Sequence, residues 1–390
     1  MLRLLIIFIG IALLVAAGIW LAWPRAKATG AVAPAPASPA TWPMYRGGST
    51  LSGAVPGLPS AYKLKWSRKV GAKIEASPVI SETLVVVADE DGLISALDRV
   101  SGKTLWSVDE KGGVEASPLL VGQSVVVATL SGDVISFQLQ DGKEQWRFKT
   151  KAAIHGAPNS VVVGGRQLIL FGDYDFSLYA LDAAGGTVVW QVKTENFING
   201  SPAIDAEGKY AAFGGCDGWL RVVELASGQE KAQMQADSYL PSSPSIHAGT
   251  AYVGSHAMAL YAVELASGKL LWTFNAKDGD PLLAPPATDG QLVLLNCGRN
   301  RLIIDARTGK QKLSFPARGA SSAGALIGSG KALLVDEAGW ITLASLADGK
   351  TLWEYEIGPK ITATPAIAGR DMVVADTGGT VYCFEKDGTR

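Results

Sequence analysis

Four polar side chains recur at nearly even intervals in the first half of the chain. Glu115 follows Glu75 by 40 residues, His155 follows Glu115 by 40, and Asn199 follows His155 by 44. Each stands three residues before a proline and directly before an alanine or a glycine. Two carboxylates, an imidazole and an amide that meet at one point could hold a cation or a small polar ligand. The alternative is that these groups only keep the wall of a water-filled channel solvated.

A longer motif recurs in step with these residues and indicates which elements would bring them together. Its clearest copy is ALDRVSGKTLW at residues 96–106, and its turn glycine returns at intervals of 39 to 44 residues. A small residue before proline, such as Ser77-Pro78, runs in step with it, and Ala323-Gly324 takes its place in the seventh unit. The eight turn glycines are Gly102, Gly142, Gly186, Gly228, Gly268, Gly309, Gly349 and Gly388.

Each unit divides into four short runs rich in β-forming residues, which in the first unit lie near 74–80, 83–88, 93–98 and 104–108. A repeat of about 40 residues in four antiparallel strands is typical of a propeller blade. We therefore predict an all-β, eight-bladed β-propeller of four-stranded antiparallel blades over residues 62–390. The first strand of a blade lines the central channel, so the four polar residues should meet at the channel mouth. The matching residues of the other blades are Pro241, Leu283, Ser321 and Thr362.

The two ends of the repeat region complement each other. The last unit ends before its fourth strand, while residues 63–69 have the form of a fourth strand but precede the first unit. Pairing 63–69 with the strand at 380–385 would close the ring and remove both exposed sheet edges.

Tryptophans mark the fourth strand of most units and should wedge neighbouring sheets together. Ala232 and Leu313 replace them in the fourth and sixth units, where we expect looser contacts. The acidic residue of the motif, such as Asp98, precedes a tight turn and should accept backbone N–H bonds. The predicted blade-docking residues are Trp66, Trp106, Trp146, Trp190, Trp272 and Trp353.

The pattern A-x-D-x-x-[TS]-G-K-x-x-W, which residues 96–106 fit throughout, resembles the motif of the pyrroloquinoline-quinone (PQQ) repeat superfamily. The resemblance covers about 62–390, and the lead-in WPMYRG at 42–47 is also similar to such proteins. The superfamily includes quinoprotein alcohol dehydrogenases and the BamB-like propellers of outer-membrane protein assembly. Likeness to the dehydrogenases implies PQQ, Ca²⁺ and adjacent cysteines; likeness to the BamB-like propellers implies a periplasmic scaffold.

Composition and spacing exclude several other kinds of site. A net charge of −1 argues against nucleic acid, because no basic excess is available to neutralise phosphates. Three cysteines without a C-x-x-C pair predict neither a disulfide framework nor a zinc knuckle. Cys216, His256 and Cys297 occupy equivalent positions, but a quarter turn of the ring separates the two cysteines and argues against a shared metal. We expect no catalytic set.

The N-terminus has a different composition. Residues 4–23 form an uncharged apolar run of twenty residues, long enough as a helix to span a bilayer core of roughly 30 Å. We predict a transmembrane anchor within 1–28, with a cleaved signal peptide as the alternative. Residues 29–61 then form a Pro/Ala-rich linker and lead-in.

Two functions remain open from the sequence. The first is a non-enzymatic, monomeric propeller, anchored by a single pass in the bacterial inner membrane or secreted to the periplasm. It would bind other envelope proteins through one rim, as the BamB-like resemblance implies. The second is a PQQ- and Ca²⁺-dependent oxidoreductase with its site at the channel mouth, on Glu75, Glu115 or Asn199.

Overall fold

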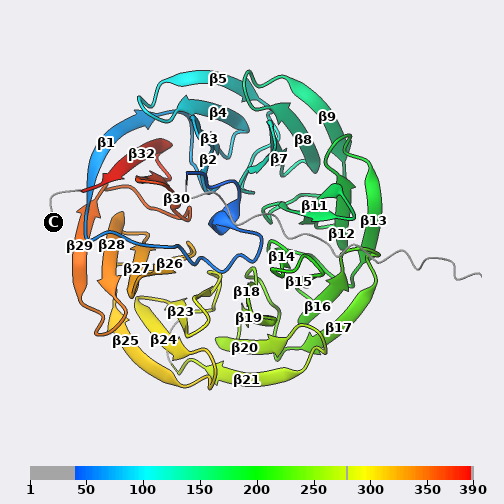
Figure 1. The fold of residues 1–390 in the computed structure, drawn as a ribbon, viewed down its shortest axis with the longest axis vertical. Coiled ribbons are helices and arrows are strands. Elements are labelled where there is room, and N and C mark those ends of the chain that lie inside the picture. The colour runs from blue at the N-terminus through cyan, green and yellow to red at the C-terminus, as the bar shows by residue number, and fades with distance from the viewer. Residues whose placement is uncertain (1–39, 278–279, 388–390) are drawn as a thin grey trace, which may run out of the picture. The chain divides into compact units, whose positions relative to one another are not determined.

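The computed structural model describes residues 40–277 and 280–387, in which 32 strands form eight four-stranded antiparallel sheets. Successive sheets follow one another around a ring, with the short first strands innermost and the fourth strands at the outer edge (Figure 1). The predicted all-β, eight-bladed propeller is confirmed. The predicted transmembrane segment lies outside the described residues, and no helix within them is long and apolar enough to cross a membrane.

The strands of the first four blades have these bounds. Blade one holds β2 (Val79–Ile80), β3 (Leu84–Ala88), β4 (Leu93–Asp98) and β5 (Thr104–Asp109). Blade two holds β6 (Leu119–Val121), β7 (Ser124–Ala128), β8 (Asp133–Gln138) and β9 (Glu144–Lys149). Blade three holds β10 (Asn159–Val163), β11 (Arg166–Gly172), β12 (Ser177–Asp182) and β13 (Val188–Lys193). Blade four holds β14 (Ala203–Ile204), β15 (Tyr210–Gly214), β16 (Trp219–Glu224) and β17 (Glu230–Gln235).

The remaining blades repeat the pattern. Blade five holds β18 (Ser245–His247), β19 (Thr250–Gly254), β20 (Ala259–Glu264) and β21 (Leu270–Asn275). Blade six holds β22 (Ala287–Thr288), β23 (Leu292–Cys297), β24 (Asn300–Asp305) and β25 (Gln311–Pro316). Blade seven holds β26 (Leu326–Gly328), β27 (Lys331–Val335), β28 (Trp340–Ser345) and β29 (Thr351–Glu356). Blade eight holds β30 (Ala366–Ala368), β31 (Asp371–Ala375), β32 (Thr380–Lys386) and, from the other end of the chain, β1 (Tyr62–Lys69).

The position of a strand within its blade explains its composition. The second strand is packed on both faces, so β3 is a continuous apolar run in which every residue is buried. The fourth strand has one solvated face, and β5 alternates exposed and partly buried residues along its second half. Apolar clusters form between adjacent sheets, as between blades one and two and between blades two and three, and a single larger cluster joins blades seven, eight and one at the closure.

The ring closes where the two ends of the repeat region meet. β1 pairs antiparallel with β32 from Tyr62 opposite Lys386 to Lys69 opposite Thr380, which is the pairing expected for residues 63–69. A buried charge network reinforces the joint. Asp371 accepts hydrogen bonds from Arg99 at 2.7 Å and from Lys65 at 3.2 Å, and so ties blades one and eight to the closing strand.

Within the described residues, five tryptophans of the motif contact the turn glycine of the next blade. The Trp106 indole donates to the Leu139 carbonyl at 3.0 Å, and a Cβ on Gly142 would lie 2.7 Å from its ring. Trp66, Trp146, Trp190 and Trp272 make the same kind of hydrogen bond at 2.9–3.1 Å, while Trp353 packs edge-on against Tyr62 and Phe384. Glycine is therefore required at these turns both for positive φ and for the space that the indole occupies.

The two units without the tryptophan differ from each other. In blade six the Phe315 side chain covers Gly349, where a Cβ would lie 2.6 Å away, so an aromatic contact two residues along the strand replaces the one missing at Leu313. In blade four the backbone of Gln233 and the small Ala232 side chain face Gly268. We therefore still predict a looser joint between blades four and five, whereas Phe315 supplies an aromatic contact between blades six and seven.

The lead-in runs across the central channel and hydrogen-bonds to the first strands of many blades. Trp42 pairs with Ile80, Ser49 accepts from Ile204, and Thr50 accepts from Ile246, each at 2.7–2.8 Å. Ser52 and Gly53 accept from Thr288 and Ile327, and the 3₁₀ turn η1 (Tyr45–Gly47) lies at the centre of the ring (Figure 1). These bonds follow from the exposed inner edges of the first strands, whose N–H groups need acceptors.

Arg46 in this lead-in is buried, with 2% of its surface exposed. Its guanidinium donates to the carbonyls of Pro285 and Pro286 at 2.9 and 2.7 Å. Burial lowers the pKa of this group to about 10. Gly324 N–H bonds the Thr364 hydroxyl as Ser77 N–H bonds that of Ser117, so Gly324, and not Ala323 as the sequence analysis had it, is the counterpart of Ser77. A Cβ on Gly324 would lie 2.4 Å from the Arg46 guanidinium, which explains the glycine.

Candidate functional site

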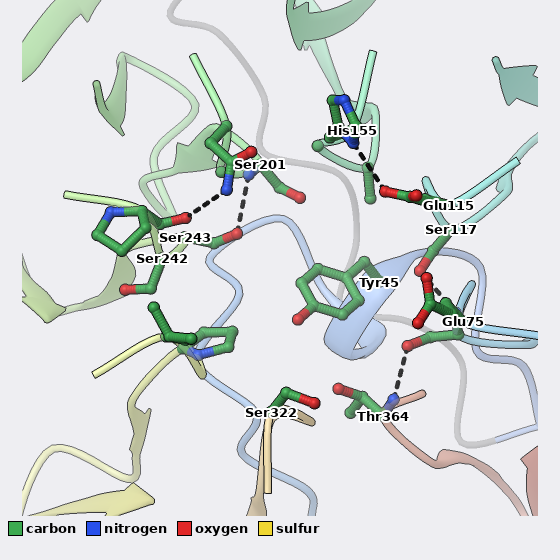
Figure 2. Close-up of a pocket in the computed structure, with 18 of the residues that line it drawn as sticks. Tyr45, Glu75, Glu115, Ser117, His155, Ser201, Ser242, Ser243, Ser322 and Thr364 are labelled. Carbon is green, nitrogen blue, oxygen red and sulfur yellow. Dashed lines mark hydrogen bonds and ion pairs between the residues drawn. The ribbon is translucent and has the colours of Figure 1, made fainter. Parts of the chain in front are cut away.

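The channel mouth is a polar cup of about 160 Å³. Side chains from the segments just before the first strands form its wall, and Tyr45 of the lead-in rises into its centre (Figure 2). Glu75, Glu115, His155 and Asn199 all line it, so the structure brings the four predicted residues to one cavity. The sequence predicts an open channel here, but the lead-in crosses that channel and forms the floor of the cup.

Hydroxyl groups hold the wall of the cup together from blade to blade. The backbone N–H of Ser77 donates to the Ser117 hydroxyl at 2.9 Å, and that of Ser201 donates to the Ser243 hydroxyl at 2.8 Å (Figure 2). Across the closure, Gly324 N–H donates to the Thr364 hydroxyl and Thr364 N–H to the Ser77 hydroxyl, both at 2.8 Å. The small residue before proline therefore links adjacent blades.

Close packing near the axis explains the small residues beside the polar ones. A Cβ on Gly156 would lie 2.7 Å from the Gly200 carbonyl, and one on Gly200 would lie 2.9 Å from the Ser242 carbonyl. No side chain fits between first strands that approach this closely.

The two acids of the cup are already paired. His155 Nδ1 lies 2.7 Å from Glu115 Oε2, and this hydrogen bond lowers the pKa of the Glu115 carboxyl against the opposing effect of burial. Lys73 lies 2.9 Å from Glu75 and 3.3 Å from Glu90, and its hydrogen bond to Glu75 raises the pKa of the lysine. Glu75 and Glu115 are therefore the acidic side chains that line the cup, and each already has a partner, Lys73 or His155.

Asn199 connects the cup to a row of aromatic rings. It accepts a hydrogen bond from the Tyr174 hydroxyl at 2.5 Å and donates to the Pro241 carbonyl at 3.1 Å. The Tyr174 ring lies 4.3 Å from His155 and 4.5 Å from Phe197, centroid to centroid, and Phe197 lies 5.3 Å from Phe176. We call Tyr174, Phe176 and Phe197 the aromatic strip; it leads outward from the lip of the cup.

The position assigned to blade seven in the sequence analysis was wrong by one residue. Ser322, not Ser321, lines the cup. The hydrogen bond from Glu337 N–H to the Ala320 carbonyl matches that from Glu90 N–H to the Lys73 carbonyl, so Ser322 is the counterpart of Glu75. The seventh unit lacks the marker proline, and without it the sequence offered no fixed point for counting.

The other predicted positions lie apart from the cup. Cys216, Cys297 and Cys383 form no disulfide bond among the described residues, and His256 stacks on Tyr239 at 4.4 Å. Within residues 40–277 and 280–387, no three His, Cys, Asp or Glu side chains gather in a way that could hold a metal ion. The turn acids do accept backbone bonds, as at Asp98, which accepts from Ser101 N–H at 2.7 Å.

Two contributors to the site were missed by reasoning from the sequence. Tyr45 lies in the lead-in, outside the repeat, and its place at the centre of the cup follows only from the path of that segment. Tyr174 lies in the turn between β11 and β12, which the blade pattern assigns to a loop. An available signal was the aromatic run of this third unit, YDF at 174–176 with Phe197 nearby, which no other unit matches.

PQQ does not fit this cup. A flat tricyclic quinone needs a pocket of the size that drug-like ligands occupy, about 300–1,000 Å³, and Tyr45 stands in the available 160 Å³. The carboxylates of PQQ would also face those of Glu75 and Glu115, and like charges in a confined site repel. Calcium fits no better, because it takes six to eight oxygen ligands, whereas within the described residues no three His, Cys, Asp or Glu side chains gather where they could share an ion.

Comparison with known proteins now places the chain. The family model described as outer membrane protein assembly factor BamB matches residues 59–157, 90–240, 130–280 and 216–360. A curated relative, the outer membrane protein assembly factor BamB of Moranella endobia (strain PCIT), is 25% identical over 333 residues, which is 80% of this chain and 75% of the relative.

Solved structures show the same fold at lower identity. BamB from Moraxella catarrhalis matches with a TM-score of 0.69 at 14% identity, over 85% of this chain and 99% of that chain. Quinohemoprotein alcohol dehydrogenase from Comamonas testosteroni matches with a TM-score of 0.75 at 16% identity, over 91% of this chain and 82% of that chain. Both likenesses concern the fold alone, and it is the family model, which matches well over half of the sequence, that identifies this chain as a member of the outer membrane protein assembly factor BamB family.

Proposed function

We propose that this protein is a non-enzymatic propeller scaffold of the bacterial cell envelope that binds partner proteins during outer-membrane protein assembly. The observation that carries the proposal is the family match over residues 59–360. The structure supports it, because the propeller joints are locked by tryptophan, hydroxyl and charge contacts and leave a rigid rim for docking. Binding on a rigid surface loses less conformational entropy than binding on a mobile one.

The alternative, a PQQ- and Ca²⁺-dependent oxidoreductase, rests on the quinohemoprotein dehydrogenase fold likeness. The floor that Tyr45 provides and the acidic lining of the cup both weigh against it. We propose that the protein needs no cofactor.

The N-terminal segment completes the proposal. The apolar run at residues 4–23 would anchor the protein in the inner membrane, and the Pro/Ala-rich stretch from residue 29 would tether a monomeric propeller in the periplasm. Release of the propeller by signal cleavage is the alternative, and the size of the mature protein in membrane and periplasmic fractions distinguishes the two.

The function is tested in a strain from which the chain is deleted. We expect less folded outer-membrane protein, measured by heat-modifiable mobility on gels, and restoration by the full-length chain. Normal levels of folded outer-membrane protein in the deletion strain would refute the assembly role. The alternative is tested on purified protein incubated with PQQ and Ca²⁺, where quinone absorbance that persists through gel filtration, with dye reduction by alcohols, would establish the oxidoreductase instead.

A further inference from the structure

We propose that the cup and the aromatic strip form one docking site for a partner protein loop that presents a lysine beside an apolar or aromatic residue. The proposal rests on the scaffold function above, and it specifies the surface and the chemistry of the partner. The lysine enters the cup, and its neighbour packs on the strip.

The cup has room for a slender side chain. Its volume is about 160 Å³, and Tyr45 stands in its centre (Figure 2). Lysine carries its charge on an unbranched chain of four methylenes, whereas arginine ends in a wider planar group. The preference for a lysine therefore rests on this shape together with the charge of the lining.

The lining of the cup suits a cation. Its acidic side chains are Glu75 and Glu115. Lys73 pairs with Glu75 at 2.9 Å and with Glu90, just outside the cup, at 3.3 Å, whereas the partner of Glu115 is the imidazole of His155. The positive Arg46 is beneath the floor, where its guanidinium donates to backbone carbonyls and lines no part of the cup. An incoming ammonium has three donors, and the Glu115 carboxylate and the surrounding hydroxyls supply acceptors. A cation that loses water requires such pairing.

The aromatic strip supplies the second half of the site. Phe176 and Phe197 are 36% and 39% exposed, large fractions for side chains of this size and polarity. Phe176 also adopts a φ of 61°, a left-handed conformation that is unfavourable for a bulky residue and that is concentrated at functional sites. Aromatic faces attract cations as well as apolar groups, so the strip reinforces the preference of the cup.

Continuity between the two parts makes them one surface. His155 lines the cup and contacts Tyr174, which contacts Phe197, and Asn199 joins the same ring to the cup wall. A lysine in the cup therefore places adjacent residues of its own loop over the strip.

The test is selection from a library of disulfide-cyclised peptides with randomised loops, panned against the full-length protein. We expect selected loops to share a lysine next to an aromatic or apolar residue. A fluorescent copy of the selected peptide should bind the Glu75→Gln/Glu115→Gln double variant about tenfold or more weakly, because charged hydrogen bonds are lost. Phe197→Ser should weaken binding as well.

Matched controls keep the result specific. Glu90→Gln removes the same charge on the same rim but outside the cup, and Leu352→Ser removes an exposed apolar residue from the outer strand β29. Both should bind the peptide as the unaltered protein does, and thermal unfolding confirms that every variant is folded. Selected loops without a basic residue, or equal binding by the double variant and the Glu90→Gln control, would overturn the proposal.

The outcome in cells separates this inference from the proposed function. We expect the double variant to restore folded outer-membrane protein poorly in the deletion strain, whereas Glu90→Gln restores it. Full restoration by the double variant would leave the scaffold function standing and reject the cup as its docking site.

Discussion

Replacing one turn glycine tests the packing that holds adjacent blades together. Gly142 has a φ of 72°, and a Cβ there would lie 2.7 Å from the Trp106 ring. Gly122, in the turn between β6 and β7, has a φ of 58° and nothing within 4 Å of such a Cβ. Gly142→Ala and Gly122→Ala therefore introduce the same backbone strain, and only the first also displaces an indole.

The magnitudes follow from these two effects. Alanine in the left-handed region costs about 1–2 kcal/mol, which is the whole expected loss for Gly122→Ala. Forcing an extra methyl into a packed joint costs a further 1–3 kcal/mol or so. The free energy of unfolding of Gly142→Ala should then fall by about 2–5 kcal/mol, measured by urea denaturation followed by far-UV circular dichroism.

A double-mutant cycle isolates the indole. In a Trp106→Ala background the space above Gly142 is vacant, so Gly142→Ala should there cost no more than Gly122→Ala. Equal losses for the two single glycine variants, or an unchanged cost of Gly142→Ala without the indole, would refute the view that the tryptophan docks on the next blade's turn glycine.

Three further predictions concern closure, lead-in and cup. Asp371→Asn leaves Arg99 and Lys65 without their carboxylate and should lower the free energy of unfolding by about 3 kcal/mol. Asp141→Asn removes a carboxylate from an exposed ion pair and should leave the free energy of unfolding unchanged. Equal effects of the two substitutions would contradict the role of Asp371 in closing the ring. Leu51→Ala in the buried lead-in should lower the free energy of unfolding by about 2–4 kcal/mol, and Leu352→Ala at an exposed site should lower it much less. An unchanged free energy of unfolding in Leu51→Ala would show that the lead-in is not packed against the propeller. His155→Leu should raise the pKa of Glu115, because its main hydrogen bond is lost while burial remains, as followed by carbon-13 NMR titration. In the unaltered protein this lowered pKa stabilises the fold at pH values above the ordinary glutamate pKa of about 4.3. That contribution is lost as the pH falls through the lowered pKa. A Glu115 pKa that does not respond to His155→Leu would contradict the pairing.

The sequence determined the architecture, because a propeller is built from local units. Each blade carries its own turn glycine, its own alternating strands and its own small residue near the axis, so eight similar stretches predict eight similar sheets. The periodicity also determined which polar residues share the channel mouth, since equal positions in repeated units lie at equal heights. The same counting failed at Ser321 because the marker proline is missing there.

Only the tertiary structure decided what that mouth is. The lead-in lies outside the repeat, and its path depends on hydrogen bonds to residues far along the chain, such as the bond from Arg46 to the Pro285 carbonyl, 239 residues away. No local pattern encodes such contacts. That path puts Tyr45 in the channel, closes the channel to form an acidic cup, and leaves too little room for a quinone. The pairing of Glu115 with His155, and the joining of Tyr174 to Asn199, likewise depend on side chains that meet only across neighbouring blades.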